Sequence, residues 1–399
     1  MFRSDDCESI CFDILERDAS GVVPEINIDD CFQDGRYHIL NKLGQGDYAN
    51  VWLARDNQND CNVSIKTIAA SGSSDRQLDI LQRLNNGDTQ HPGYKHTSRL
   101  LDFFYYDSPS GRSLFLVMEC LGPSLYTMID NELTPDVRRF SLSLSRQVSR
   151  QLLLAVDYLQ ACGIVHGDIN ASNVLFCIPT TLQSKSDSWK PQAYEASKKD
   201  GEPVDSMWYS EEDCDKFTEV KLVGFSNSFL ISDPSATITT ATNQCPPELL
   251  FKKPLSEAID IWGLACTTYW LVTSKNLFDS GLSDKRCLVP RYYEVAGEAS
   301  ASWLLTHLVN SVRDGAWKGW PYSPFFKINQ DYPSLEKRLL SDFSRVGDDN
   351  APSAIEVAKE KLGILARYLR KMLVVDAKER ADTKELLGDE WVQEQQQDE

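Results

Sequence analysis

Alternating apolar and polar positions in the first third of the chain predict an antiparallel sheet. Three such runs, YHILNKLG, NVWLARD and NVSIKTIA, follow one another from residue 37, and short turns rich in glycine, asparagine or aspartate separate them. Two more runs, at 98–106 and 113–120, lie on either side of a DSPSG turn. Because strand side chains point alternately to opposite faces, these runs are typical of strands that are joined by tight turns and buried on one face.

Helical spacing of apolar residues occurs once within this strand-rich part and dominates after residue 121. The segment DRQLDILQRLNN places its leucines and isoleucine near a helical period, which predicts one helix between the third and fourth strands. A long amphipathic segment ends on Gly163, a typical helix stop. A buried helix is expected over 257–272, and further helices up to Trp391.

Three polar segments show no such period. Residues 1–36 are acidic and irregular, and we expect them to form an N-terminal extension. Residues 179–218 are rich in serine, lysine, aspartate and glutamate, and they predict a flexible insert. Residues 392–399 are expected to form a polar tail.

The composition is that of a globular protein, with 42% hydrophobic and 25% charged residues among 399, which excludes disorder along the whole chain. No apolar run is long enough for a membrane span, and the N-terminus lacks the basic start and apolar core of a secretory signal. The eleven cysteines are scattered without zinc-ligand spacing, so we expect reduced thiols in the cytoplasm, the nucleus or both. No membrane association is expected.

The charge balance bears on the kind of partner. With 59 acidic and 41 basic residues the formal net charge is −18. Binding to nucleic acid needs clustered lysine and arginine, so we expect no nucleic-acid partner. A basic protein partner or protein substrate suits this charge better.

Glycines between the first two strands are a candidate phosphate-binding feature. In GQGDYANV, the absence of a side chain at Gly44 and Gly46 would let backbone amides approach phosphate oxygens. Lys66 stands on the next strand, about 15 residues beyond Val51, where its ammonium could reach such phosphates. Taken alone, the same residues favour an ordinary turn between strands and a surface lysine.

The segment HGDINASN, residues 166–173, carries a sharper signal. Asp168 and Asn173 stand five residues apart, and phosphoryl transfer needs a carboxylate that orients the accepting hydroxyl and an amide oxygen that binds a metal. The alternative is that both residues only hydrogen bond the loop backbone. His166 is interpreted as a packed core histidine.

Together with PPE at 246–248, DIW at 260–262 and a late Arg380, these motifs resemble the protein kinase family over residues 37–391. The closer resemblance is to the SR-protein kinases, through GRYHILNKLGQGDYANVWLARD, HPGYKHTSRLLDFF, VMECLGPSL and the place of the insert. The resemblance implies an α+β, bilobal protein-kinase-like fold with nucleotide between the lobes. The small β-rich lobe would span 37–118, the hinge 119–122, and the larger helical lobe 123–391.

The resemblance also implies roles for individual residues. Lys66 would contact the α- and β-phosphates of ATP, Met118 would be the gatekeeper, and backbone groups of Glu119 and Leu121 would hold adenine. Asp168 would be the catalytic aspartate, and Asn173 a catalytic residue and metal ligand. The other nucleotide-binding positions would be Leu43, Gly44, Gly46 and Val51, and the structural positions Gln77, Glu248, Asp260 and Arg380, with Glu248 paired to Arg380 and Asp260 supporting the catalytic loop.

Three departures from the family pattern affect the chemistry. VKLVGFSNS has Gly224 where the family has its metal-binding aspartate, which puts the use of Mg²⁺ in question although ATP remains the expected cofactor. Asn170 replaces a lysine that contacts the γ-phosphate. The partner of Lys66, a glutamate in the family, aligns with Gln77 or alternatively with Asp79.

The sequence therefore predicts an ATP-binding member of the SR-protein kinase family with weak or absent phosphoryl transfer, that is, a pseudokinase. The alternative is an active Ser/Thr kinase with atypical metal use and protein substrates, including Arg/Ser-rich ones. A third reading is a kinase-shaped scaffold that has lost nucleotide binding as well. Replacing Gly224 by aspartate should raise activity sharply if the rest of the site is intact.

Overall fold

The computed structural model describes most of the chain between residues 24 and 393. The described residues are 24–45, 49–69, 72–109, 111–130, 139–183, 211–233, 238, 240–278, 285–297, 300–315, 317, 333–344 and 352–393. No helix within these ranges is long and apolar enough to cross a membrane.

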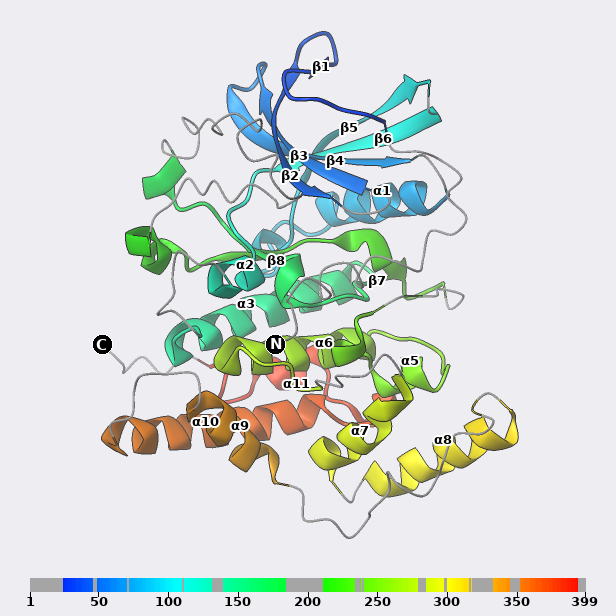
Figure 1. The fold of residues 1–399 in the computed structure, drawn as a ribbon, viewed down its shortest axis with the longest axis vertical. Coiled ribbons are helices and arrows are strands. Elements are labelled where there is room, and N and C mark those ends of the chain that lie inside the picture. Colours follow the sequence, from blue (N-terminus) through cyan, green and yellow to red (C-terminus); the bar gives the residue numbers. More distant parts are fainter. Residues whose placement is uncertain are drawn as a thin grey trace, which may run out of the picture.

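The described part of the first third forms one antiparallel sheet of six strands in the order β1-β2-β3-β4-β6-β5 (Figure 1). The strands are β1 (Cys31–Phe32), β2 (Tyr37–Gln45), β3 (Ala49–Asp56), β4 (Cys61–Ala69), β5 (Leu100–Ser108) and β6 (Gly111–Glu119). The five strands that the alternation predicts are confirmed. β1 lies inside the expected extension 1–36, so the end of that segment belongs to the sheet rather than being irregular.

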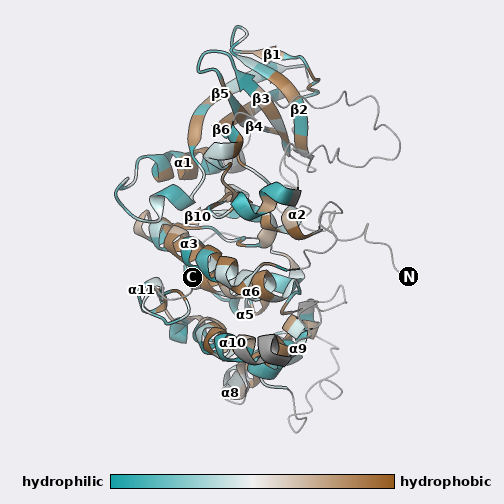
Figure 2. Ribbon diagram, turned by 90° about the vertical axis from the view of Figure 1, so that its left-hand side faces the viewer, coloured by the Kyte–Doolittle hydropathy of each residue, from teal (hydrophilic) through white to brown (hydrophobic). Residues whose placement is uncertain are grey.

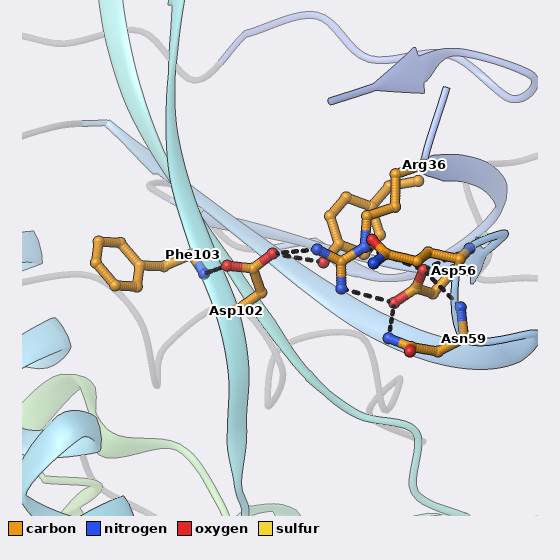
Figure 3. A network of polar contacts seen from close by, with 7 residues as sticks. Arg36, Asp56, Asn59, Asp102 and Phe103 are labelled. Carbon is orange, nitrogen blue, oxygen red and sulfur yellow. Dashed lines mark hydrogen bonds and ion pairs between the residues drawn. The ribbon is translucent and has the colours of Figure 1, made fainter. Parts of the chain in front are cut away.

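Side chains from both edges of this sheet meet, which curls it. The Phe32 ring of β1 lies 5.2 Å from the Tyr106 ring of β5. Arg36, in the turn before β2, donates to Asp102 of β5 at 2.8 Å, and the Tyr37 hydroxyl donates to the same carboxylate at 2.7 Å (Figure 3). Asp102 thus joins the edge strand β5 to the start of β2, with three strands between them in the sheet order.

Asp56, at the end of β3, anchors the other side of the Arg36 guanidinium. Arg36 donates to both of its carboxylate oxygens, at 3.0 and 3.1 Å, and the Asn59 amide donates at 2.8 Å (Figure 3). Burial alone would raise the pKa of Asp56, but these bonds and two from backbone N–H groups of the following turn outweigh it and lower the pKa to about 2.

Helix α1 (Gly72–Asn85) lies beneath the sheet, at its border with the helical part (Figure 1). Leu78, Ile80, Leu81 and Leu84 are buried in the larger hydrophobic core, which confirms the helical spacing. Its position places one polar face of the helix against the sheet residues that carry the candidate chemistry.

The larger lobe is built mainly from helices, and Figure 1 shows them stacked below the sheet. The helices are α2 (Leu125–Asp130), α3 (Leu142–Ala161), α5 (Pro247–Leu250), α6 (Ala258–Thr273), α7 (Leu288–Ala296), α8 (Ala301–Arg313), α9 (Leu335–Ser344), α10 (Pro352–Met372) and α11 (Thr383–Leu387). Short antiparallel pairs join β7 (Ile164–Val165) to β10 (Phe229–Leu230) and β8 (Val174–Phe176) to β9 (Val220–Leu222). This α+β, bilobal arrangement is the fold expected from the motifs.

Two helices form the centre of this lobe. α3 is banded with apolar and hydrophilic residues (Figure 2), and it ends just before Gly163, whose φ of 73° is a conformation that glycine adopts without strain. α6 is buried along almost its whole length and holds Trp262 at 0% exposure. Both predicted helices are confirmed.

Both ends of the expected flexible insert 179–218 are part of the described structure. Short 3-10 turns span Thr180–Leu182 and Glu211–Lys216, and the side chains of Leu182 and Phe217 are buried in the core. Residues 184–210 lie outside the described residues. At the C-terminal end Trp391 and Val392 are buried, so packing continues one residue into the expected tail.

Candidate functional site

Lys66 lies where the sheet meets the helical lobe. It is paired across the sheet with Val51 of β3, and its Nζ donates to Gln77 Oε1 of α1 at 3.3 Å and to Ser226 Oγ at 2.8 Å. The structure thus brings Lys66 to Gln77 rather than to Asp79, which is paired with Arg83. Ser226, two residues after Gly224, was not singled out from the sequence.

The last residues of β6 lie beside β4. Ser64 of β4 is paired with Met118, and its hydroxyl donates to the backbone carbonyl of Glu119 at 3.1 Å. The Glu119 carboxylate accepts from Lys221 Nζ at 2.6 and 2.7 Å. Leu121, two residues further on, is partly buried.

The glycine-rich turn is described only in part. Gly44 lies on β2 opposite Val51, and Leu43 is 48% exposed. Gly46 lies outside the described residues. Leu43, Gly44, Val51 and Lys66 therefore stand on the three neighbouring strands β2, β3 and β4.

Asp168 is held by side-chain amides. Asn170 Nδ2 donates to its Oδ1 at 3.0 Å, Asn173 Nδ2 donates to its Oδ2 at 2.9 Å, and the Asn227 amide also contacts it. Burial is the largest influence and raises the pKa of Asp168 to about 6, although the three amides counteract it. All three of these donors to the Asp168 carboxylate are neutral amides.

Asn170, for which the resemblance implies the place of a lysine, also has a local role. Its Oδ1 accepts hydrogen bonds from the backbone N–H groups of Ser172 at 2.9 Å and Asn173 at 3.1 Å, and so caps the 3-10 turn Ala171–Asn173. The side chain fixes the loop geometry and orients Asp168 at the same time. It brings no positive charge to the site.

Gly224 has a left-handed backbone, with φ 83° and ψ 45°. A Cβ atom added there would lie 2.4 Å from Asn173 Oδ1, which is closer than real contacts allow. Asn173 keeps this position through bonds from its Nδ2 to the Asp168 carbonyl and carboxylate, both at 2.9 Å. The place that an aspartate side chain would need is therefore taken by the amide of Asn173.

His166 is a packed structural residue, as interpreted from the sequence. Its ring contacts Phe225 edge-on with centroids 5.0 Å apart, and its Nε2 bonds the Val223 carbonyl at 2.9 Å. Burial lowers the pKa of His166 to about 4, so the ring is neutral at physiological pH. Its Nδ1 accepts from the Asp168 N–H at 3.2 Å, which fits this tautomer.

Asp260 of α6 supports the same loop from below. Its two carboxylate oxygens accept from the backbone N–H groups of His166 at 2.7 Å and Gly167 at 2.9 Å. Burial raises the pKa of Asp260 to about 7, against the effect of both bonds. Farther from the site, Glu248 and Arg380 form a two-pronged ion pair at 2.8 and 3.1 Å with side chains 3% and 0% exposed.

Two of the described site residues, Asn173 and Asp168, could offer oxygen atoms to a metal ion. No three histidine, cysteine, aspartate or glutamate side chains within the described ranges come together as they would around a metal. Asn173 offers one amide oxygen next to Gly224, and Asp168 offers a carboxylate that already accepts amide bonds. Divalent Mg²⁺ in such sites is held by carboxylates together with phosphates.

A cavity of about 320 Å³ lies apart from these residues, where the ends of α1 and α3 approach, and its lining includes Arg83, His91, Tyr158 and Cys162. Its polar groups already have protein partners: His91 contacts Asp157 at 3.2 Å, and the Tyr158 hydroxyl donates to the Leu84 carbonyl at 2.6 Å. None of the expected site residues lines it.

Comparison with known proteins gives one family. A model described as the protein kinase domain matches residues 37–392. The chain is 36% identical over 152 residues to protein kinase dsk1 of Schizosaccharomyces pombe, a match covering 37% of this chain and 27% of that protein. It is 27% identical over 281 residues to the serine/threonine-protein kinase SRPK of Physarum polycephalum, covering 62% and 63%. SRSF protein kinase 3 of Mus musculus is 29% identical over 158 residues, covering 38% and 27%. The matches thus span about a quarter of the first and third relatives and under two thirds of the second.

Proposed function

The chain belongs to the protein kinase family, as a serine/threonine kinase homologue of the SR-protein kinase type, and on this premise we propose that it binds ATP but transfers the phosphoryl group weakly or not at all. One observation carries the proposal. Gly224 stands where the family has its metal-binding carboxylate, and the Asn173 amide fills the space that a side chain there would need.

The expected loss of rate follows from what the reaction requires. Phosphoryl transfer depends mainly on positioning and on neutralising the charge of the β- and γ-phosphates. Without the carboxylate at position 224 the main metal is poorly held, and Asn170 supplies an amide where a lysine would face the γ-phosphate. Losing several kcal/mol of transition-state stabilisation slows transfer on the order of a thousandfold.

The contacts of Lys66 support nucleotide binding. Its ammonium is held by Gln77 and Ser226, and we expect it to bind the α- and β-phosphates of ATP. The backbone at Glu119 and Leu121 would hold adenine beside Met118. Because these groups bind the nucleotide through a lysine and the main chain, we propose that ATP binding does not depend on Mg²⁺.

A working kinase with atypical metal use is the second candidate, and one observation favours it. The Asp168 pKa of about 6 suits a group that orients and deprotonates a substrate hydroxyl near neutral pH. In this case Asn173 Oδ1 and the Asp168 carboxylate, completed by phosphate oxygens, would hold the metal. The two side chains are neighbours, because Asn173 Nδ2 donates to Asp168 Oδ2 at 2.9 Å, while Asn173 Oδ1 lies on the side of Gly224.

A thermal-shift series separates the candidates. A ligand that binds only the folded protein raises its melting temperature, so ATP is tested with Mg²⁺, with Mn²⁺ and with EDTA, and Lys66→Met serves as the control for phosphate binding. If binding is independent of metal, ATP raises the melting temperature in EDTA as well, and it raises that of the Lys66→Met variant less. A rise that requires metal, together with transfer of labelled phosphate to a protein substrate, would support the working kinase. No rise in any condition would refute ATP binding.

For the partner, we propose a basic protein, with Arg/Ser-rich segments as the first class to test. The net charge of −18 supports a basic partner, and one relative is named an SRSF protein kinase. In this role the protein acts as a scaffold, decoy or allosteric partner in the cytoplasm or nucleus. Titration of an Arg/Ser-repeat peptide at rising salt tests this, since electrostatic binding weakens with salt, whereas a salt-independent or absent signal would contradict it.

A further inference from the structure

Ser64 stands on the face of β4 that carries Lys66. Side chains two residues apart in a strand share a face, and Val63 and Ile65, the two neighbours of Ser64 along the strand, are fully buried in a hydrophobic core on one face of the sheet. Ser64 therefore lies on the opposite side from this core, next to the end of β6. The same strand thus presents a hydroxyl and an ammonium on the side of the candidate site.

The Ser64 hydroxyl already uses a group that a nucleotide base would need. It donates to the Glu119 carbonyl at 3.1 Å and lies 3.5 Å from the Met118 carbonyl. In the proposed function, on which this inference rests, the backbone at Glu119 holds the base. A carbonyl oxygen accepts only from donors, and it therefore selects the 6-amino group of adenine over the 6-oxo group of guanine.

We infer that Ser64 is a specificity-determining residue that relaxes the selection of adenine and admits 6-oxo purine nucleotides such as GTP. A hydroxyl is both a donor and an acceptor, and it rotates to suit its partner. When adenine is bound, the Ser64 hydroxyl and the 6-amino group each donate to one lone pair of the Glu119 carbonyl. When guanine is bound, the hydroxyl rotates and donates to the 6-oxo oxygen, which would otherwise face the carbonyl without a donor. With alanine at position 64, only the carbonyl acceptor would face the base.

The test is the ratio of the dissociation constants of GTP and ATP, measured by calorimetric titration in EDTA and again with Mg²⁺. In the unmodified protein the two constants are expected to lie within about tenfold of each other. Ser64→Ala should increase the preference for ATP about fivefold, the effect of one neutral hydrogen bond. Ser64→Thr keeps a hydroxyl and should leave the ratio unchanged.

Thr67→Val is the matched control, because Thr67 stands on the same strand and also donates its hydroxyl to a backbone carbonyl, that of Asn50 at 3.3 Å. It should leave the ratio unchanged. Ser64→Ala could bind ATP with the same ratio of the GTP and ATP dissociation constants as the unmodified protein. In that case Ser64 only connects β4 to the end of β6, and the inference is wrong although ATP binding stands. If the unmodified protein binds neither nucleotide, the proposed function fails and this inference fails with it.

Discussion

Replacing Gly224 by aspartate tests the reason that we propose for weak catalysis, and the structure predicts that this change destabilises the protein. The new Cβ would lie 2.4 Å from Asn173 Oδ1, so the Asn173 side chain must turn away. This breaks its two bonds to Asp168, both at 2.9 Å. A second carboxylate would also face Asp168, whose pKa is already raised to about 6.

The magnitude follows from these contacts. Two hydrogen bonds, one of them to a carboxylate, contribute about 2–4 kcal/mol to the free energy of unfolding. A non-glycine residue at a φ of 83° adds about 1 kcal/mol. At about 2.1 cal/mol/K of unfolding entropy per residue, a loss of about 3–5 kcal/mol lowers the melting temperature of a domain of this size by about 4–7 °C.

The assay combines melting curves with phosphoryl transfer. In EDTA, Gly224→Asp should melt about 4–7 °C below the unmodified protein, as should the controls Gly224→Ala and Gly224→Asn, which add the same Cβ without a carboxylate. With Mg²⁺ and ATP, only the aspartate variant should recover stability, because only it gains a metal ligand, and its transfer rate should rise at least about tenfold. Equal melting of all four proteins in EDTA would show that Asn173 is not held as described. Equal responses of the aspartate and asparagine variants to Mg²⁺ would show that the missing carboxylate is not what limits catalysis.

Three further predictions concern charge and capping. Asp56→Asn should lose about 2 kcal/mol of stability at pH 7. Since the folded-state pKa of about 2 lies below the unfolded value, this difference should be complete above about pH 5 and shrink as the pH falls toward 2, as checked by urea unfolding. Arg380→Met should lose about 3–5 kcal/mol by leaving the Glu248 carboxylate buried alone, and the double variant with Glu248→Met should recover much of this in the same assay. Asn170→Lys should lose about 1 kcal/mol with the cap and, without a carboxylate at position 224, should not restore transfer of labelled phosphate.

The sequence predicted those parts of the molecule whose signals are local. Strand alternation and helical spacing located β2 to β6, α1, α3 and α6, because periodic burial follows from each element's own geometry. The two-residue strand β1 was missed, since it is too short to show a period. The buried Phe217 was placed in a flexible insert because one apolar residue in a polar stretch gives no pattern.

The candidate site was likewise predictable only where its signals are local in the sequence. Motif order was enough to single out Lys66 and Gln77, which the structure brings within 3.3 Å. It could not show that Ser226 bonds Lys66, or that the Asn173 amide occupies the space beside Gly224, because these contacts join segments far apart in the chain. The spacing of two residues between Ser64 and Lys66 was visible in VSIK and could have placed both on one face of the strand.

The departures from the kinase pattern share a physical character. In the alignment that we propose, Asn170 takes the place of a lysine and Gln77 that of a glutamate, and each has hydrogen bonds of its own: Asn170 caps a turn and orients Asp168, and Gln77 accepts from Lys66. Gly224 likewise leaves room that Asn173 uses. On this proposal, amides hold the geometry of the site in places where the family uses charges. Restoring a single charge breaks a contact that now stabilises the loop, so recovery of full activity should require several changes made together.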